Sequence, residues 1–67
     1  MLSIKQIRVG ANLTIDDASV LCDCSAPTFA KWEKEPVKME IGAFSKLLAF
    51  YNKQNPGKPI SYEDVEF

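Results

Sequence analysis

The chain contains no histidine among its 67 residues, and its three glycines, Gly10, Gly42 and Gly57, are far apart. Without histidine, most general acid–base schemes lose their usual proton carrier. No serine lies between the glycines of a nucleophile elbow, and no glycine-rich loop is present to hold phosphate. These absences argue against an enzyme, so we expect no catalytic residues and no cofactor.

Cysteine is also scarce, because only Cys22 and Cys24 are present, one residue apart. This spacing differs from that of zinc-binding and redox pairs, and there is no histidine to complete a metal site. A disulfide across a single residue would be strained. We therefore expect two small buried thiols and no bound metal.

Long apolar runs are missing too. No stretch approaches the roughly 20 apolar residues that span a bilayer. The opening "MLSIKQIRV" has neither the apolar run nor the small-residue cleavage site of a signal peptide. With 46% hydrophobic and 25% charged residues, the composition is that of an ordinary globular protein. We expect one cytoplasmic domain over residues 1–67, with no membrane contact.

Positive charge is concentrated in the middle of the chain. The net charge is −1, from eight Lys and Arg against nine Asp and Glu. Three acidic residues lie in the last seven positions, so residues 1–60 carry eight positive against six negative charges, or +2. Residues 24–58 carry six lysines against three glutamates, or +3. This balance is compatible with a nucleic-acid partner but does not require one.

Apolar residues recur at spacings of three and four, which predicts helices. The second and third helices are expected over residues 15–22 and 26–35. The first runs from Ile4 to Ala11 or Asn12, the fourth runs from Met39 or Glu40 to Asn52, and a last short helical turn follows Ser61. In the fourth of these helices the apolar face is predicted to consist of Ile41, Phe44, Leu47, Leu48 and Tyr51. Ser3, Thr14, Ser25 and Ser61 precede these segments and are predicted to cap them. The loop "NKQNPGKP" separates the last two, and no segment resembles a strand. The predicted fold class is all-α, with four to five short helices.

The second and third predicted helices form a unit over about residues 15–35. Their connecting turn contains Asp23, a residue type that tolerates the left-handed conformation. Ser19 is small enough for a close helix approach, and Phe29 and Trp32, three apart, are predicted to face the core. This is the pattern of a helix-turn-helix. The outward face of its second helix is predicted to carry Pro27, Thr28, Lys31 and either Lys34 or Glu35.

The stretch "LTIDDASVLCDCSAPTFAKWEKE" resembles the phage repressor and Cro-type helix-turn-helix family, which is also called xenobiotic-response-element or lambda-repressor-like. The resemblance lies in the leading Leu-Thr, the Asp pair, Ser25 and above all Trp32-Glu33. The segments "KMEIGAFSKLLAFY" and "KPISYEDVEF" resemble the fourth and fifth helices of that family, so the resemblance covers residues 3–67. It implies a compact four- to five-helix domain whose recognition helix enters the DNA major groove.

The resemblance also implies the site residues. Those expected at DNA are Ser25, Ala26, Pro27, Thr28, Lys31, Lys34 and Lys38. Thr28 can donate or accept a hydrogen bond, and Lys31 would reach guanine or a phosphate. The residues expected to contact phosphates are Lys34, Lys38 and Ser25, with Lys5 as a further candidate. Ala26 and Pro27 can meet a thymine methyl but cannot form paired hydrogen bonds with a base. By position, Arg8 and Glu33 correspond to the ion pair that joins the first helix of the family to its recognition helix.

The chain departs from the family pattern at several positions. Asp23 replaces the usual glycine of the turn. Ile15 stands where a polar residue commonly holds the DNA backbone, and Glu35 stands where glycine commonly ends the recognition helix. The apolar pair Ala26-Pro27 occupies two base-reading positions. The resemblance therefore implies few direct contacts with bases.

Three functions are compatible with this pattern. The first is a sequence-specific transcriptional regulator, a repressor or Cro-like protein of a phage or mobile element that occupies a double-stranded DNA operator as a homodimer. The second is a helix-turn-helix protein that binds another protein, as an antirepressor or modulator; the third, less favoured, is an antitoxin. The C-terminal residues Tyr62, Val65 and Phe67 either close the core or form part of a dimer interface.

Overall fold

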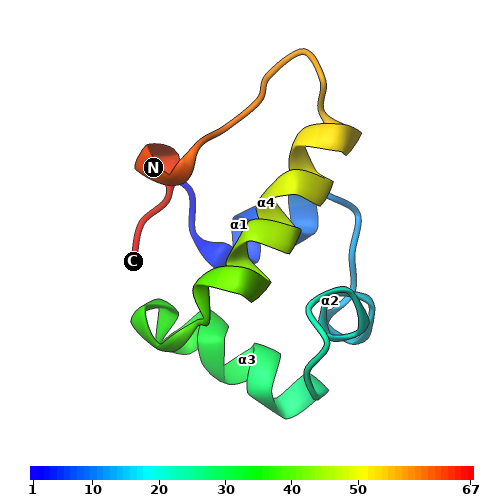
Figure 1. The fold of residues 1–67 in the computed structure, drawn as a ribbon, viewed down its shortest axis with the longest axis vertical. Coiled ribbons are helices and arrows are strands. Elements are labelled where there is room, and N and C mark those ends of the chain that lie inside the picture. Colours follow the sequence, from blue (N-terminus) through cyan, green and yellow to red (C-terminus); the bar gives the residue numbers. More distant parts are fainter.

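The computed structural model describes all 67 residues, and it consists of helices and turns without a β-strand (Figure 1). The elements in chain order are α1 (Ile4–Gly10), α2 (Ile15–Leu21), α3 (Ala26–Lys34), the 3-10 turn η1 (Pro36–Lys38), α4 (Ile41–Gln54) and the 3-10 turn η2 (Tyr62–Asp64). The predicted all-α class is confirmed. The first three helices each end at least one residue earlier than predicted, and the predicted last turn is a 3-10 turn.

Side-chain caps explain where the first three helices begin. The hydroxyl oxygens of Ser3 and Thr14 accept hydrogen bonds from the backbone N–H groups three residues on, each at 3.1 Å. In both cases the third residue, Gln6 or Asp17, accepts a hydrogen bond from the cap backbone in return. Ser25 caps α3 in the same way, through the Thr28 N–H at 3.3 Å. These caps satisfy amide groups that a helix start leaves unpaired.

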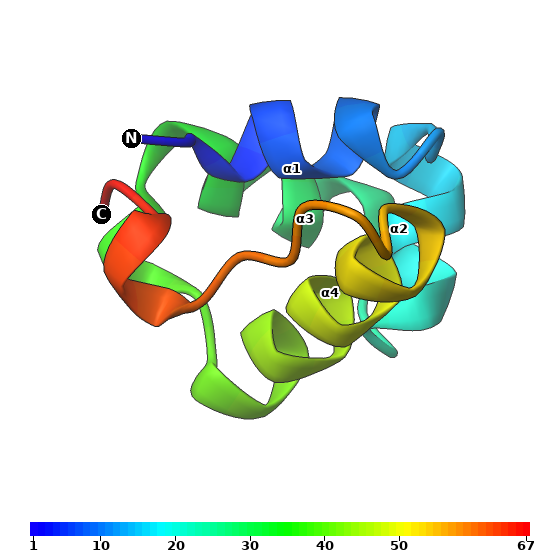
Figure 2. The ribbon, with the colours of Figure 1, turned by 90° about the horizontal axis from the view of Figure 1, so that it is seen from above.

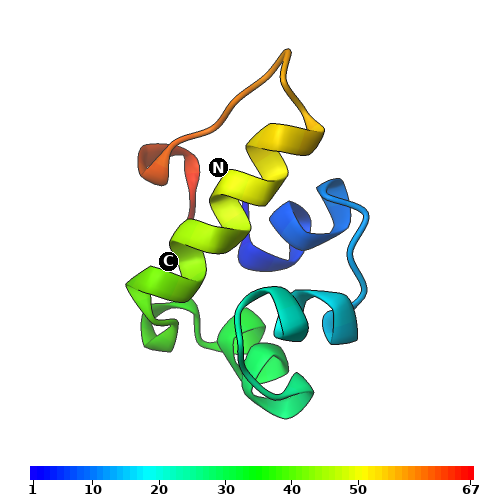
Figure 3. The ribbon, with the colours of Figure 1, turned by 45° about the vertical axis from the view of Figure 1, so that its right-hand side comes forward.

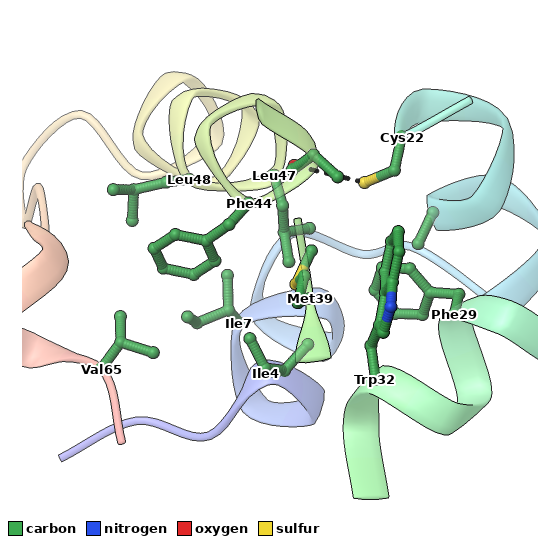
Figure 4. Close-up of a cluster of buried hydrophobic side chains, with 12 residues drawn as sticks. Ile4, Ile7, Cys22, Phe29, Trp32, Met39, Phe44, Leu47, Leu48 and Val65 are labelled. Carbon is green, nitrogen blue, oxygen red and sulfur yellow. Dashed lines mark hydrogen bonds between the residues drawn. The ribbon is translucent and has the colours of Figure 1, made fainter. Parts of the chain in front are cut away.

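One hydrophobic core joins all four α-helices (Figure 4). Its largest fully buried side chains are Phe29, Phe44, Ile4, Ile7 and Leu47. Phe29 and Trp32 of α3 lie at one end of the cluster, and Val65 of the C-terminal segment lies at the other. Because Phe29, Trp32 and Phe44 are all buried, they are packing residues, as the helical spacing predicted.

Helix α4 starts and ends later than the sequence predicted. Ile41, expected on the apolar face, is 69% exposed, and the prediction for this residue is wrong. It is the first residue of the helix, and Met39, two residues earlier, occupies the core at this end (Figure 4). The helix continues past Asn52 to Gln54, where the Asn55 side chain donates a hydrogen bond to the Tyr51 carbonyl at 3.0 Å.

Asn52 has a role that the sequence did not reveal. Its Nδ2 donates to the carbonyl of Ile60 at 2.9 Å, and its Oδ1 accepts from the Ile60 N–H at 2.8 Å. The paired hydrogen bonds hold the returning 55–60 loop against the side of α4. This interaction makes the loop a fixed connection between α4 and the C-terminal segment.

The two ends of the chain lie side by side (Figure 2). Leu2 forms an isolated parallel β-bridge with Val65, in which the Leu2 N–H donates to Asp64 O and the Glu66 N–H donates to Leu2 O, both at 2.8 Å. Val65 is 3% exposed and closes the core, one of the two roles left open for this segment. Tyr62 and Phe67 pack against Phe44 at ring-centroid distances of 5.2 and 5.1 Å, yet they remain about half exposed.

Two glycines should respond in opposite ways to alanine. A Cβ on Gly10 would lie 2.7 Å from Tyr51 Cε2, whereas a Cβ on Gly42 meets nothing within 4 Å. Gly42→Ala should raise the stability by roughly 0.5–1 kcal/mol through helix propensity, and Gly10→Ala should lower it by about 1–3 kcal/mol through overpacking. Thermal unfolding followed by circular dichroism measures both. A Gly10→Ala variant as stable as Gly42→Ala would contradict the close packing of Tyr51.

Candidate nucleic-acid interface

The turn between α2 and α3 is built as the sequence predicted. Asp23 has a φ of 57°, in the left-handed region, which Asp enters more readily than most residues. The Cys24 N–H then donates to the carbonyl of Ser19 at 2.9 Å, so the chain reverses within residues 22–25. Ser25 immediately starts α3. The short turn fixes the direction of α3 relative to α2.

Helix α3 packs by its inner face. Phe29 is fully buried and Trp32 is 7% exposed, and their rings meet edge to face at 6.1 Å. On α2, Ala18 is fully buried and Ser19 is 6% exposed, and the Ser19 hydroxyl donates to the Asp16 carbonyl at 2.7 Å. Ser19 therefore lies where the two helices approach closely without leaving its hydroxyl unpaired. Figures 1 and 3 show α3 at one end of the long axis, with its far side open to solvent.

A largely buried ion pair ties α3 to α1. Arg8 Nε lies 2.6 Å from Glu33 Oε2, and the side chain of each residue is 11% exposed. Arg8 Nη1 also donates to the carbonyl of Leu13 at 2.9 Å, in the connection that leads into α2. One guanidinium therefore joins α1, the α1–α2 connection and α3. This is the pair expected between Arg8 and Glu33, and it fixes how α3 is presented.

The outward face of α3 carries both lysines and apolar groups. Pro27, Lys31 and Lys34 are exposed, and Ala26 and Ala30 are half-buried. Since residues three, four and seven apart share a helix face, these five side chains form one continuous surface, which we call the α3 face. Sequence reasoning did not single out Ala30, although its spacing from Pro27 and Lys34 places it there.

Two expected contact residues already have partners within the chain. Thr28 is half-buried, and its hydroxyl accepts a hydrogen bond from Ser25 Oγ at 2.8 Å. Lys38 lies on η1 rather than on α3, and its Nζ is 3.3 Å from Glu35 Oε1. Both partners of this pair are about half exposed, so the pair is screened by solvent and weak. Lys31 and Lys34, the two lysines of α3, form no ion pair.

The start of α2 contributes little positive charge. Ile15 is half-buried and packs against the core instead of reaching outward. Asp16 and Asp17 are exposed in the first turn, where the helix dipole favours carboxylates. Helix α2, which contains no lysine or arginine, therefore adds no positive charge to that of Lys31, Lys34 and Lys38.

The two cysteines are reduced, as free thiols. Cys22 is 6% exposed, and its Sγ donates to the Ala43 carbonyl at 3.5 Å. Burial, followed by the neighbouring Cys24, raises the pKa of the Cys22 thiol from 9.0 to about 11. Burial also raises the pKa of the half-buried Cys24. Raised pKa values reduce the thiolate fraction near neutral pH. The expectation of two buried thiols is confirmed for Cys22 and is wrong for Cys24, which is partly exposed because it lies in the α2–α3 turn.

Other types of site are not found in the structure. It has no pocket and no group of three or more side chains placed to hold a metal ion. None of its helices has the length and apolar character needed to cross a membrane. Of the seven residues expected at DNA, Ala26, Pro27, Lys31 and Lys34 lie on the α3 face, whereas Ser25 caps the helix, Thr28 is half-buried and Lys38 lies on η1.

Comparisons with known proteins identified no relative of this chain. The chain matches no family model, no curated protein and no solved structure.

Proposed function

We propose that α2, the turn and α3 form a helix-turn-helix of the lambda-repressor-like type, and that the protein is a sequence-specific DNA-binding transcriptional regulator. The observation that carries the proposal is the clamped position of α3. One face of α3 is held by Phe29, Trp32 and the Arg8–Glu33 pair, while the α3 face is free of core contacts. A rigid helix with a free cationic face at the end of the molecule is suited to the major groove.

In this proposal the residues have distinct roles. Lys31 reaches a guanine edge or a phosphate from the middle of the α3 face, and Lys34 contacts a phosphate. Ser25 and the first N–H groups of α3 lie where a phosphate would meet the positive end of the helix dipole. Lys38 contributes less than expected from the sequence, because Glu35 offsets its charge.

We also propose that two copies bind one operator. Four large apolar side chains near η1, the start of α4 and the C-terminal segment are exposed by 45–75%: Val37, Ile41, Tyr62 and Phe67. Small regulators of this type commonly bind palindromic sites as two-fold dimers. Bound to DNA, such a dimer would act by occupancy, because it would block access of RNA polymerase to the operator.

The same exposed apolar side chains support the second candidate, a protein that binds another regulator. The two candidate functions differ in how strongly the binding affinity depends on salt concentration. DNA binding through several lysines releases counterions and weakens steeply as salt rises, by a slope of about 0.9 per phosphate contact. An apolar protein interface responds much less to salt.

The test is a titration of the protein with duplex DNA from the region upstream of its own gene, at low and moderate salt. Lys31→Ala should weaken specific binding by about 5- to 100-fold, the range for a lost base contact. Lys53→Ala is the matched control, since Lys53 lies in the last turn of α4, at the opposite end of the long axis from α3 (Figures 1 and 3). It should change affinity little.

Each outcome has a clear meaning. Tight, salt-steep binding with two chains per duplex, lost in Lys31→Ala and retained in Lys53→Ala, supports the regulator. Equal losses in the two variants would indicate non-specific attraction to charge. If the folded protein binds no DNA specifically at low salt, the proposed function is wrong and the protein-binding alternative takes its place.

A further inference from the structure

The α3 face has an unusual chemical composition for a surface that reads bases. Helix α3 contains no arginine, asparagine or glutamine, the residues whose planar ends pair with guanine or adenine through two hydrogen bonds. Its one carboxylate, Glu33, is held by Arg8 and is 11% exposed. Thr28 is half-buried as a residue, and its hydroxyl accepts a hydrogen bond from Ser25 while its own O–H stays available to donate. Hydrogen-bond readout through α3 is therefore left to Lys31, Lys34 and the single hydroxyl of Thr28.

Apolar groups occupy the rest of this surface. Pro27 is exposed in the first turn, and Ala26 and Ala30 are half-buried beside it. Ala30 is three residues from Pro27 and four from Ala26, so the three side chains are neighbours on the helix surface. They form an apolar patch next to the cationic positions of Lys31 and Lys34. A groove-facing helix with this arrangement meets the bases largely through carbon atoms.

Only one base offers a matching group. In the major groove of DNA the thymine C5-methyl is the apolar feature of the base edges, and it is absent from the other three bases. Burying one such carbon against an apolar surface strengthens binding by about 4-fold, the equivalent of roughly 0.8 kcal/mol. Small side chains such as Ala and Pro also let the helix backbone approach the bases closely.

We propose that the protein recognises its operator through thymine methyl groups, with Pro27, Ala26 and Ala30 as the specificity-determining residues and Lys31 and Lys34 as the anchoring cations. This inference rests on the proposed function. It predicts operator half-sites whose central positions are T·A or A·T pairs, read by apolar contact.

The experiment uses the full chain and an operator selected from a library of random duplexes. Each thymine of the selected duplex is then replaced, one at a time, by deoxyuridine, which lacks the methyl group but keeps every hydrogen-bonding group of the base edge. At least one position in each half-site should lose affinity by about 4-fold, with larger losses where two methyl groups are removed together.

Two variants assign the effect to the α3 face. Pro27→Ala introduces a residue that the first turn of a helix accepts, and it removes part of the apolar surface at this position. It should therefore reduce the discrimination between thymine and uracil at one position. Lys34→Ala should weaken the thymine and uracil duplexes by the same factor, because a phosphate contact does not sense the base. Circular dichroism melting of each variant checks that the fold is retained.

The results separate this inference from the function on which it rests. Specific binding that is insensitive to uracil at every position overturns methyl readout and leaves the regulator intact. A library from which no sequence is enriched overturns both. Uracil sensitivity that falls at one position in Pro27→Ala supports the inference, and uracil sensitivity that Pro27→Ala leaves unchanged at every position overturns the assignment to the α3 face.

Discussion

Replacing Glu33 with glutamine should lower the melting temperature of the protein by roughly 12 °C or more. The change removes the charge that faces Arg8 at 2.6 Å, while both side chains remain 11% exposed. A buried charge that loses its partner destabilises a protein by about 3–5 kcal/mol. In a domain of this size each kcal/mol corresponds to a shift of roughly 4–8 °C. Thermal and urea unfolding of the purified variant measure the effect.

A matched surface change provides the control. Glu40 is exposed and forms no ion pair, so Glu40→Gln should change the free energy of unfolding by less than about 0.5 kcal/mol. Replacing both partners, as Arg8→Met with Glu33→Leu, should recover part of the lost stability, since no unpaired charge then remains. The recovery is incomplete because the Leu13 carbonyl loses the hydrogen bond that Arg8 donates. If Glu33→Gln matches Glu40→Gln, the pair has no structural role.

The Arg8–Glu33 experiment also bears on function. The pair holds α3 against α1 and the α1–α2 connection, so its loss loosens the element that presents the α3 face. At temperatures where Glu33→Gln is still folded, any effect on DNA affinity should be smaller than that of Lys31→Ala. A residue that positions a helix changes stability first, whereas a residue that touches the ligand changes affinity first.

Phe44→Ala should unfold much of the protein at 37 °C. Phe44 is 1% exposed and contacts the rings of Tyr62 and Phe67. Truncating a buried phenylalanine costs about 3–5 kcal/mol, against a total stability of roughly 3–10 kcal/mol for a chain of this length. The variant should also release the C-terminal segment, so the Glu66 amide, which donates to Leu2 O, should exchange with solvent much faster. Circular dichroism and hydrogen exchange measure the two effects.

Phe50→Ala is the matched control for Phe44→Ala, because Phe50 lies on the same helix but outside the core. It lies in α4 but is half-buried and does not belong to the hydrophobic cluster. Phe50→Ala should therefore cost clearly less than Phe44→Ala and should leave the exchange of the Glu66 amide unchanged. Equal losses in the two variants would mean that Phe44 does not fasten the C-terminal segment to α4.

Local features were predictable from the sequence because they depend on residues that are close in the chain. Ser3, Thr14 and Ser25 cap their helices through groups three residues away. Asp23 adopts the left-handed turn conformation that its short side chain tolerates. The burial of Phe29 and Trp32 follows from their spacing on one helix. Each of these outcomes needs only helix geometry and the chemistry of one short segment.

The candidate site was predictable only in part. Helix periodicity placed Pro27, Lys31 and Lys34 on the outward side of α3, where they are exposed. It did not reveal that Glu35 forms a weak ion pair with Lys38 or that the Thr28 hydroxyl accepts a hydrogen bond from Ser25. Whether a polar side chain is free or paired depends on rotamers and neighbours that a spacing rule does not contain.

The sequence by itself determined the all-helical class, the caps, the α2–α3 turn and the outward positions of α3. The tertiary structure decided how these helices meet: it buried Met39 in place of Ile41, used Asn52 to hold Ile60 and joined Leu2 to Val65. These pairings connect segments that are distant along the chain, and many partners of similar chemistry compete for each of them. Only the packing of the whole core selects among those partners, because a buried side chain must fill the space that all its neighbours leave.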